Sequence, residues 1–147
     1  MLAPDQNIKI TNCYFKNLEN QTSPWNGRAI DLRDNNMDSL IMINNSFYNL
    51  NSFIVRGQES TINYMQFEHN TIANSIKFPL MWYWQTNADI KNNLFYNVNS
   101  FGESDADAEG QDADGLPFGI VNVTALPSDL GITESNRLID VRNNAYF

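Results

Sequence analysis

One short pattern recurs five times along the chain and constrains the fold more than any other feature. It reads apolar-x-apolar-x-Asn-Asn-x-Phe-x-Asn, and its clearest copy occupies residues 88–98. The other copies begin at Ile8, Leu40, Met65 and Ile139, so that successive copies start 32, 25, 23 and 51 residues apart. A single copy cannot bury its apolar side alone, and we therefore expect the copies to stack on one another.

The first half of each copy alternates in the manner of a β-strand with one buried face. The two positions expected to face inward are apolar or small in every copy: Ile8, Leu40, Met65, Ala88 and Ile139, then Ile10, Met42, Phe67, Ile90 and Val141. The residues between them are mostly polar and are expected to face outward. A third inward position follows the turn and holds Phe15, Phe47, Ile72, Phe95 and Tyr146.

A pair of residues rich in asparagine separates the two halves of each copy. The pairs are Asn12-Cys13, Asn44-Asn45, His69-Asn70, Asn92-Asn93 and Asn143-Asn144. Asparagine tolerates the left-handed backbone conformation, and its side chain caps nearby backbone groups. Identical amides in stacked repeats can also hydrogen-bond to one another as a ladder. We interpret the pairs as structural, with Cys13 as a small substitute in the ladder and His69 as a turn residue rather than a catalytic one.

With its strands and asparagine turns, the repeat resembles that of right-handed parallel β-helix proteins, the pectate-lyase-like superfamily. More narrowly, it resembles β-helix domains of unknown function in secreted bacterial polysaccharide-processing proteins. The resemblance implies an all-β, right-handed solenoid of about six coils. We expect one domain over residues 1–147 with an inserted acidic loop at residues 99–115. No polar capping segment flanks the repeats, which predicts that further coils of the same protein lie at one or both ends.

Composition narrows the classes of partner. The formal net charge is −8, which argues against nucleic acid and against an anionic membrane surface. No apolar run is long enough for membrane insertion. No signal peptide precedes the first repeat, yet the resemblance implies an extracellular or cell-surface protein.

The loop at residues 99–115 carries the densest group of carboxylates in the chain. Its acidic residues are Asp105, Asp107, Glu109, Asp112 and Asp114. Carboxylates on alternate residues followed by Gly110 resemble the start of a calcium loop, but Leu116 stands where an EF-hand needs a bidentate Glu. Two interpretations remain open: a looser oxygen cage for calcium, and a solvated acidic loop.

The notable basic residues belong to a second predicted strand in each coil. Aligning the inward apolar pairs of residues 29–33, 53–56 and 80–83 places Arg33, Arg56 and Tyr83 in one outward column. Arginine suits a sugar carboxylate or sulfate, and a tyrosine ring can stack on a sugar. Alternatively, Asp31 and loop carboxylates pair with both arginines on a solvated face. Trp25, between Pro24 and Gly27, is a further exposed candidate, whereas the strand phase places Trp82 and Trp84 in the core.

These features favour a carbohydrate-binding β-helix segment whose ligand is a polysaccharide, with an acidic one suited to the arginines. A second hypothesis, implied by the resemblance, is an enzyme: a polysaccharide lyase acting on an acidic glycan, or a glycoside hydrolase. No motif assigns Arg33, Arg56 or Lys91 to catalytic roles. A third hypothesis is a structural spacer or adhesin stalk.

Overall fold

In a computed structural model, the structure describes residues 6–18, 28–33, 36–50, 54–75, 79–98, 121–123, 128 and 131–147. For residues 33, 56–60, 81–85 and 121–123, only the backbone is described. Every regular element of this part except one short 3-10 turn, η2 (Glu134–Asn136), is a β-strand. The prediction of an all-β chain is confirmed.

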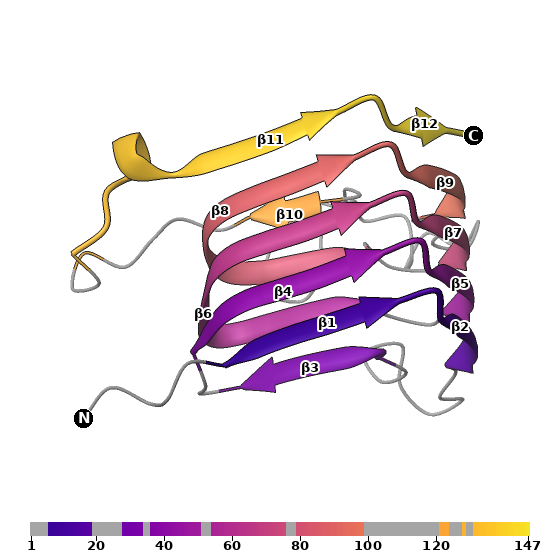
Figure 1. Cartoon of the computed structure of the whole chain (residues 1–147), viewed down its shortest axis with the longest axis horizontal. Helices are drawn as coiled ribbons and strands as arrows, with labels where there is room; N and C mark the ends of the chain where they lie inside the picture. Colours follow the sequence, from indigo (N-terminus) through magenta and orange to yellow (C-terminus); the bar gives the residue numbers. More distant parts are fainter. Residues whose placement is uncertain are drawn as a thin grey trace, which may run out of the picture.

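The strands form two sheets, and every pairing in both sheets is parallel. The seven-stranded sheet, sheet A, contains β1 (Asn7–Thr11), β3 (Ile30–Arg33), β4 (Met37–Ile43), β6 (Val55–Glu68), β8 (Leu80–Lys91), β10 (Val121–Val123) and β11 (Leu138–Arg142). The five-stranded sheet, sheet B, contains β2 (Tyr14–Leu18), β5 (Ser46–Leu50), β7 (Thr71–Ser75), β9 (Leu94–Val98) and β12 (Ala145–Tyr146). Strands β1, β4, β6, β8 and β11 lie side by side in sheet A, and Figure 1 shows that each is followed by a short strand of sheet B: β2, β5, β7, β9 and β12. This arrangement is compatible with a parallel β-solenoid.

The strand register follows the repeats of the sequence. Ile8 pairs with Leu40, Leu40 with Met65, Met65 with Ala88, and Ala88 with Ile139, so the five copies align without gaps. The inward positions of the three central copies form the core, where Leu40, Phe67 and Phe95 are fully buried. The predicted stacking and the predicted inward face are both confirmed.

The two residues of each turn pair have different roles. The first residue adopts the left-handed conformation in all five copies, with φ between 55° and 57° from Asn12 to Asn143, including 55° at His69. The interpretation of His69 as a turn residue therefore agrees with its backbone. The second residue points inward, and Asn45, Asn70 and Asn93 are buried. The left-handed backbone therefore belongs to the first member of each pair, whereas the buried amides belong to the second. The first members also contribute one amide contact, since Asn44 Nδ2 donates to Asn12 Oδ1 at 2.6 Å.

The buried amides form a continuous chain of hydrogen bonds, which we call the inner ladder. Its buried members are Asn45, Asn70 and Asn93, and it is extended at one end by the backbone N–H of the exposed Cys13 and at the other by the partly buried Asn144. Each asparagine Oδ1 accepts from the backbone N–H of the preceding member at 2.9 Å. The Nδ2 atoms of Asn45, Asn70 and Asn93 also donate to the next Oδ1, at 3.0–3.1 Å. The predicted ladder is confirmed, and it satisfies polar groups that would otherwise be buried without partners.

A second row of asparagines lies near the ends of β2, β5, β7 and β9 in sheet B. Asn17, Asn49, Asn74 and Asn97 all have positive φ, between 49° and 58°. The Nδ2 atom of each later residue donates to the Oδ1 of the earlier one at 2.9–3.1 Å. This row supports the second bend of the chain in the same way that the first turn supports the first bend.

Candidate functional site

The predicted column of Arg33, Arg56 and Tyr83 is wrong in its register. Arg33 pairs with Gln58, whereas Arg56 pairs with Asp31 on one side and Met81 on the other. Val55, rather than Phe53, occupies the row of Ile30 and Leu80. The error is a shift of two residues, and such a shift leaves the inward and outward alternation unchanged. Hydrophobic patterning therefore could not detect it.

The structure describes only some of the other residues predicted to bind a ligand or a metal ion. Asp31 is exposed, and its Oδ2 accepts a hydrogen bond from Arg28 Nη1 at 2.6 Å. For Tyr83, as for Arg33 and Arg56, only the backbone is described. Trp25 and the five acidic residues of the proposed calcium loop, Asp105, Asp107, Glu109, Asp112 and Asp114, lie outside the described residues. Within the described residues, no three His, Cys, Asp or Glu side chains cluster in a way that could hold a metal ion.

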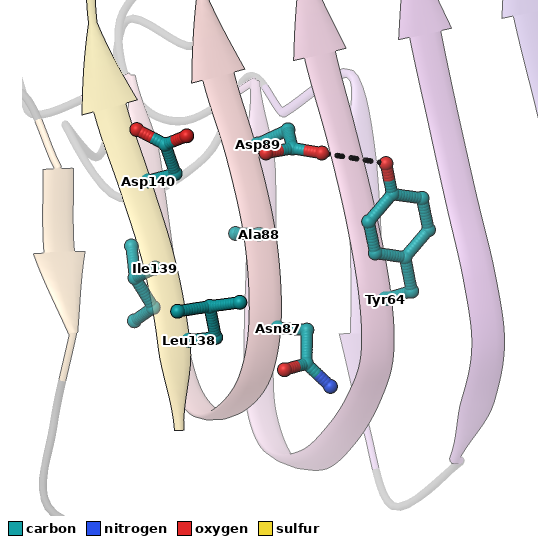
Figure 2. A pocket seen from close by; sticks show the side chains of 7 residues that line it. All are labelled: Tyr64, Asn87, Ala88, Asp89, Leu138, Ile139 and Asp140. Carbon is teal, nitrogen blue, oxygen red and sulfur yellow. Dashed lines mark hydrogen bonds between the residues drawn. The ribbon is translucent and has the colours of Figure 1, made fainter. Parts of the chain in front are cut away.

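A cavity of about 310 Å³ opens on the outer face of sheet A. Its lining comes from three neighbouring strands: Tyr64 from β6, Asn87, Ala88 and Asp89 from β8, and Leu138, Ile139 and Asp140 from β11. Parallel pairing creates this grouping, because it sets Tyr64 beside Asn87, Asn87 beside Leu138, and Asp89 beside Asp140. Figure 2 shows the side chains of Tyr64, Asp89 and Asp140 in this lining, with the tyrosine hydroxyl directed at Asp89.

Lys91 connects the two carboxylates of the cavity. Its Nζ lies 2.5 Å from Asp89 Oδ1 and 2.8 Å from Asp140 Oδ2, and its side chain is 16% exposed. Arg142 adds a contact of 3.1 Å to the same Asp140 oxygen. On the other side, Tyr64 Oη donates to Asp89 Oδ2 at 2.9 Å. The network fixes both carboxylates against the sheet and leaves one aromatic ring and one exposed aliphatic side chain, Leu138, at the rims.

The network shifts the pKa values of three of its members. Hydrogen bonds from Lys91 and then from Tyr64 lower the pKa of Asp89. Hydrogen bonds to Asp140 and then to Asp89 raise the pKa of Lys91. Burial, followed by the hydrogen bond to Asp89, raises the pKa of the Tyr64 hydroxyl. At neutral pH the site therefore holds an ionised Asp89, a protonated Lys91 and a neutral Tyr64.

These shifts predict how stability depends on pH. The pKa of Asp89 is lower in the folded state, so its contribution is present above its ordinary pKa and disappears as pH falls through the folded value. The pKa of Lys91 is raised, so its contribution is lost only as pH rises through a value above its ordinary one. We expect Asp89→Asn to lower Tm by a constant amount between about pH 6 and 9, and this deficit to shrink below about pH 4. Thermal melts of both proteins across this range provide the measurement, and a deficit that stays constant into strong acid would contradict the assignment.

Sequence reasoning did not identify this site, although one signal was present. The alignment of the repeats began at Ile8, and the preceding column contains Asn7, Ser39, Tyr64, Asn87 and Leu138. Tyr64 is its only aromatic residue, and the column beside it holds both Asp89 and Asp140. The repeat alignment that starts at Ile8 also places Glu68, Lys91 and Arg142 in one outward column, and the strand register agrees. Lys91 nevertheless forms ion pairs with Asp89 and Asp140 in the neighbouring column.

Comparisons with known proteins do not assign the chain to a family. No protein-family model matches the chain, and neither the curated proteins nor the solved structures contain a match. Among the residues that the structure describes, there is no helix of the length and apolarity needed to cross a membrane.

Proposed function

We propose that this chain is a carbohydrate-binding segment of a right-handed parallel β-helix of the pectate-lyase-like kind, in an extracellular or cell-surface protein that processes polysaccharide. The observation that supports binding is the cavity on sheet A, where an aromatic ring, an amide and two carboxylates converge from adjacent strands. Small-molecule sites combine an apolar wall with a few positioned polar groups, and their volumes run from roughly 300 Å³ upward.

Each part of the cavity corresponds to a part of a sugar. The Tyr64 ring offers an apolar surface with a polar tip, of the kind that packs against the C–H face of a pyranose. The carboxylate oxygens of Asp89 and Asp140 accept hydrogen bonds from hydroxyl groups, and ionised acceptors make the stronger bonds. Leu138 is 71% exposed and extends the apolar wall on the last strand of the site.

The charge of the lining favours a neutral glycan. Both ionisable groups among the lining residues other than tyrosine are carboxylates, and the lining includes no lysine or arginine. The nearest basic groups, Lys91 and Arg142, already form ion pairs with these carboxylates. The lining therefore offers a uronic acid no cation of its own, in contrast to the arginine-based site suggested by the sequence. Calcium bound by the loop at residues 99–115 remains a separate proposal.

A catalytic role is the second candidate, because Asp89 and Asp140 lie opposite one another on paired strands. Glycoside hydrolysis uses two carboxyl groups, of which one must be protonated to act as the acid. The pKa of Asp89 is lowered, which makes it a poor acid, and the raised pKa of Lys91 makes it a poor base for a lyase. The lowered pKa of Asp89 and the raised pKa of Lys91 suit neither residue to these roles, and we therefore propose binding. A purely structural spacer would bind no glycan at all.

Isothermal titration with neutral oligosaccharides of several hexoses and with an oligogalacturonide tests the proposal. We expect one of the neutral glycans to bind, Tyr64→Ala to weaken binding about tenfold through the lost ring contact, and Tyr64→Phe to weaken it less. The matched control is Tyr96→Ala, because Tyr96 is 55% exposed on sheet B, and its loss should leave affinity unchanged.

Three other outcomes would contradict parts of the proposal. Absence of binding to every glycan would support the spacer. Preference for the acidic glycan, weakening as salt rises, would contradict the neutral ligand. Release of unsaturated, ultraviolet-absorbing products would show a lyase.

A further inference from the structure

The inner ladder has a direction along the stack. The backbone N–H and Nδ2 of each earlier asparagine donate to the Oδ1 of the next one, in the steps from Asn45 to Asn70, Asn70 to Asn93 and Asn93 to Asn144. The second Nδ2 hydrogen of each asparagine donates back to a backbone carbonyl of the preceding repeat, as Asn93 does to Phe67 and Asn144 does to Ile90. Every step therefore requires an amide oxygen on the later member.

The two ends of the ladder consequently differ. At one end, the backbone N–H of Cys13 donates to Asn45 Oδ1, but cysteine has no amide oxygen to accept from a further repeat. Its Sγ donates instead to the carbonyl of Thr11 at 3.3 Å. At the other end, Asn144 Oδ1 is used and one Nδ2 hydrogen bonds Ile90. Among the described residues, no acceptor is recorded for the Asn144 backbone N–H or its second Nδ2 hydrogen.

Exposed apolar residues precede and follow Asn144 in the sequence, on β11 and β12. Val141 is 45% exposed and Tyr146 50%, although their counterparts one repeat earlier, Ile90 and Phe95, are fully buried. The opposite end also exposes an apolar residue, Ile8, at 40%. Exposed apolar surface thus does not distinguish the two ends, and the direction of the ladder does. Figure 1 shows β11 and β12, in yellow at the top of the view, as the outermost strands at this end of the stack.

We infer that the face formed by β11 and β12 binds a strand–turn–strand polypeptide segment carrying this same repeat, in parallel register. The inward residues of the segment would cover Val141 and Tyr146, as each repeat covers the one before it. Its second turn asparagine would place an Oδ1 to accept from both free donors of Asn144, continuing the geometry of the three earlier steps. The backbone edge of β11 would pair with the added strand, which supplies affinity, while the asparagine supplies selectivity.

A second copy of this chain is a poor occupant of that face. Head-to-tail stacking would bring the first repeat of the second copy against β11 and β12, and that repeat has Cys13 in the slot where the amide oxygen is needed. Cysteine sulfur accepts hydrogen bonds only weakly. The inferred partner is therefore a repeat with asparagine in this slot, and the inference does not depend on carbohydrate binding at the sheet A cavity.

Three synthetic peptides titrated into the full chain test the inference. The first copies residues 86–98, the second is the same peptide with Asn93→Ala, and the third copies residues 6–18, in which the slot is Cys13. We expect saturable binding of the first peptide and about tenfold weaker binding of the other two, since each lacks the oxygen that accepts two hydrogen bonds. Backbone amide shifts measured by NMR should localise to Val141, Asn144 and Tyr146.

A fourth peptide makes the comparison sharper. Cys13→Asn in the peptide of residues 6–18 should restore affinity to that of the first peptide. Equal affinity of all the peptides, shifts that localise elsewhere, or no binding would each overturn the inference. If the chain alone formed dimers through Val141, Asn144 and Tyr146, a second copy would be the partner, and the inferred asparagine-bearing repeat would be wrong.

Discussion

Replacing Asn93 with leucine is expected to lower the free energy of unfolding by about 3–5 kcal/mol. Asn93 is 2% exposed, and its Oδ1 accepts from both the backbone N–H and the Nδ2 of Asn70. Its Nδ2 donates to the carbonyl of Phe67 and to Asn144 Oδ1. Leucine has a similar size but no polar atom, so several buried groups would lose their partners at once, and each such loss costs about 1–3 kcal/mol.

Urea unfolding of the parent and variant measures this effect, with Asn63→Leu as the matched control. Asn63 is exposed, and its Nδ2 donates to Asp38 Oδ1 at 3.2 Å. The control substitution should change stability by no more than about 0.5 kcal/mol. A difference between the two variants below about 1 kcal/mol would mean that the inner ladder does not carry the stability assigned to it.

Replacing Phe47 with alanine should cost about 3–5 kcal/mol, because it removes the centre of the aromatic stack. Phe47 is 1% exposed, and its ring lies 4.9 Å from that of Phe15 and 6.3 Å from that of Phe67, measured between centroids. The repeats on both sides are held in register by the backbone pairing of β2, β5 and β7. They cannot collapse into the space left behind without breaking that pairing, so a cavity term adds to the lost burial.

The next residue in the chain provides the control. Tyr48 points outward on the same strand and is 41% exposed. Tyr48→Ala should therefore cost less than about 1 kcal/mol. Similar losses for the two substitutions, measured by chemical unfolding, would mean that β5 does not present Phe47 inward and Tyr48 outward as the register requires.

The sequence predicted the stacked repeats because two independent signals agreed at each copy. The apolar alternation set the inward face, and the asparagine pair fixed where each strand ends, so the pairing of Ile8, Leu40, Met65, Ala88 and Ile139 had a single solution. The ladder followed from the recurrence of asparagine at the second turn position. The left-handed φ of His69 was also foreseen, because histidine is among the residues that tolerate it.

Where only one signal was present, the sequence left the register open. Around Arg33 and Arg56 no turn pair marks the strand end, and alternation alone cannot distinguish alignments that differ by two residues. In the structure, the predicted strand around Arg56 and the following repeat belong to one long strand, β6. The pairing register of β6 shifts between Gly57 and Thr61. Such an irregularity leaves little trace in hydrophobic patterning.

The cavity was missed for a different physical reason. Its polar groups are outward residues, which follow no burial pattern. They come from repeats 23 and 51 residues apart in sequence, counted between equivalent ladder positions. Only the register brings Tyr64, Asp89 and Asp140 together. Lys91 could be placed in its column from the sequence, but its choice of Asp89 and Asp140 as partners depends on side-chain geometry.

Mapping the binding surface by NMR tests the proposed function most directly. Backbone amide shifts would be recorded for the full chain during titration with the neutral oligosaccharides. We expect saturable shifts confined to Tyr64, residues 87–91 and residues 138–142, and we expect them to disappear in Tyr64→Ala. Saturable shifts centred instead on sheet B around Tyr96, or no shifts with any neutral glycan, would contradict it.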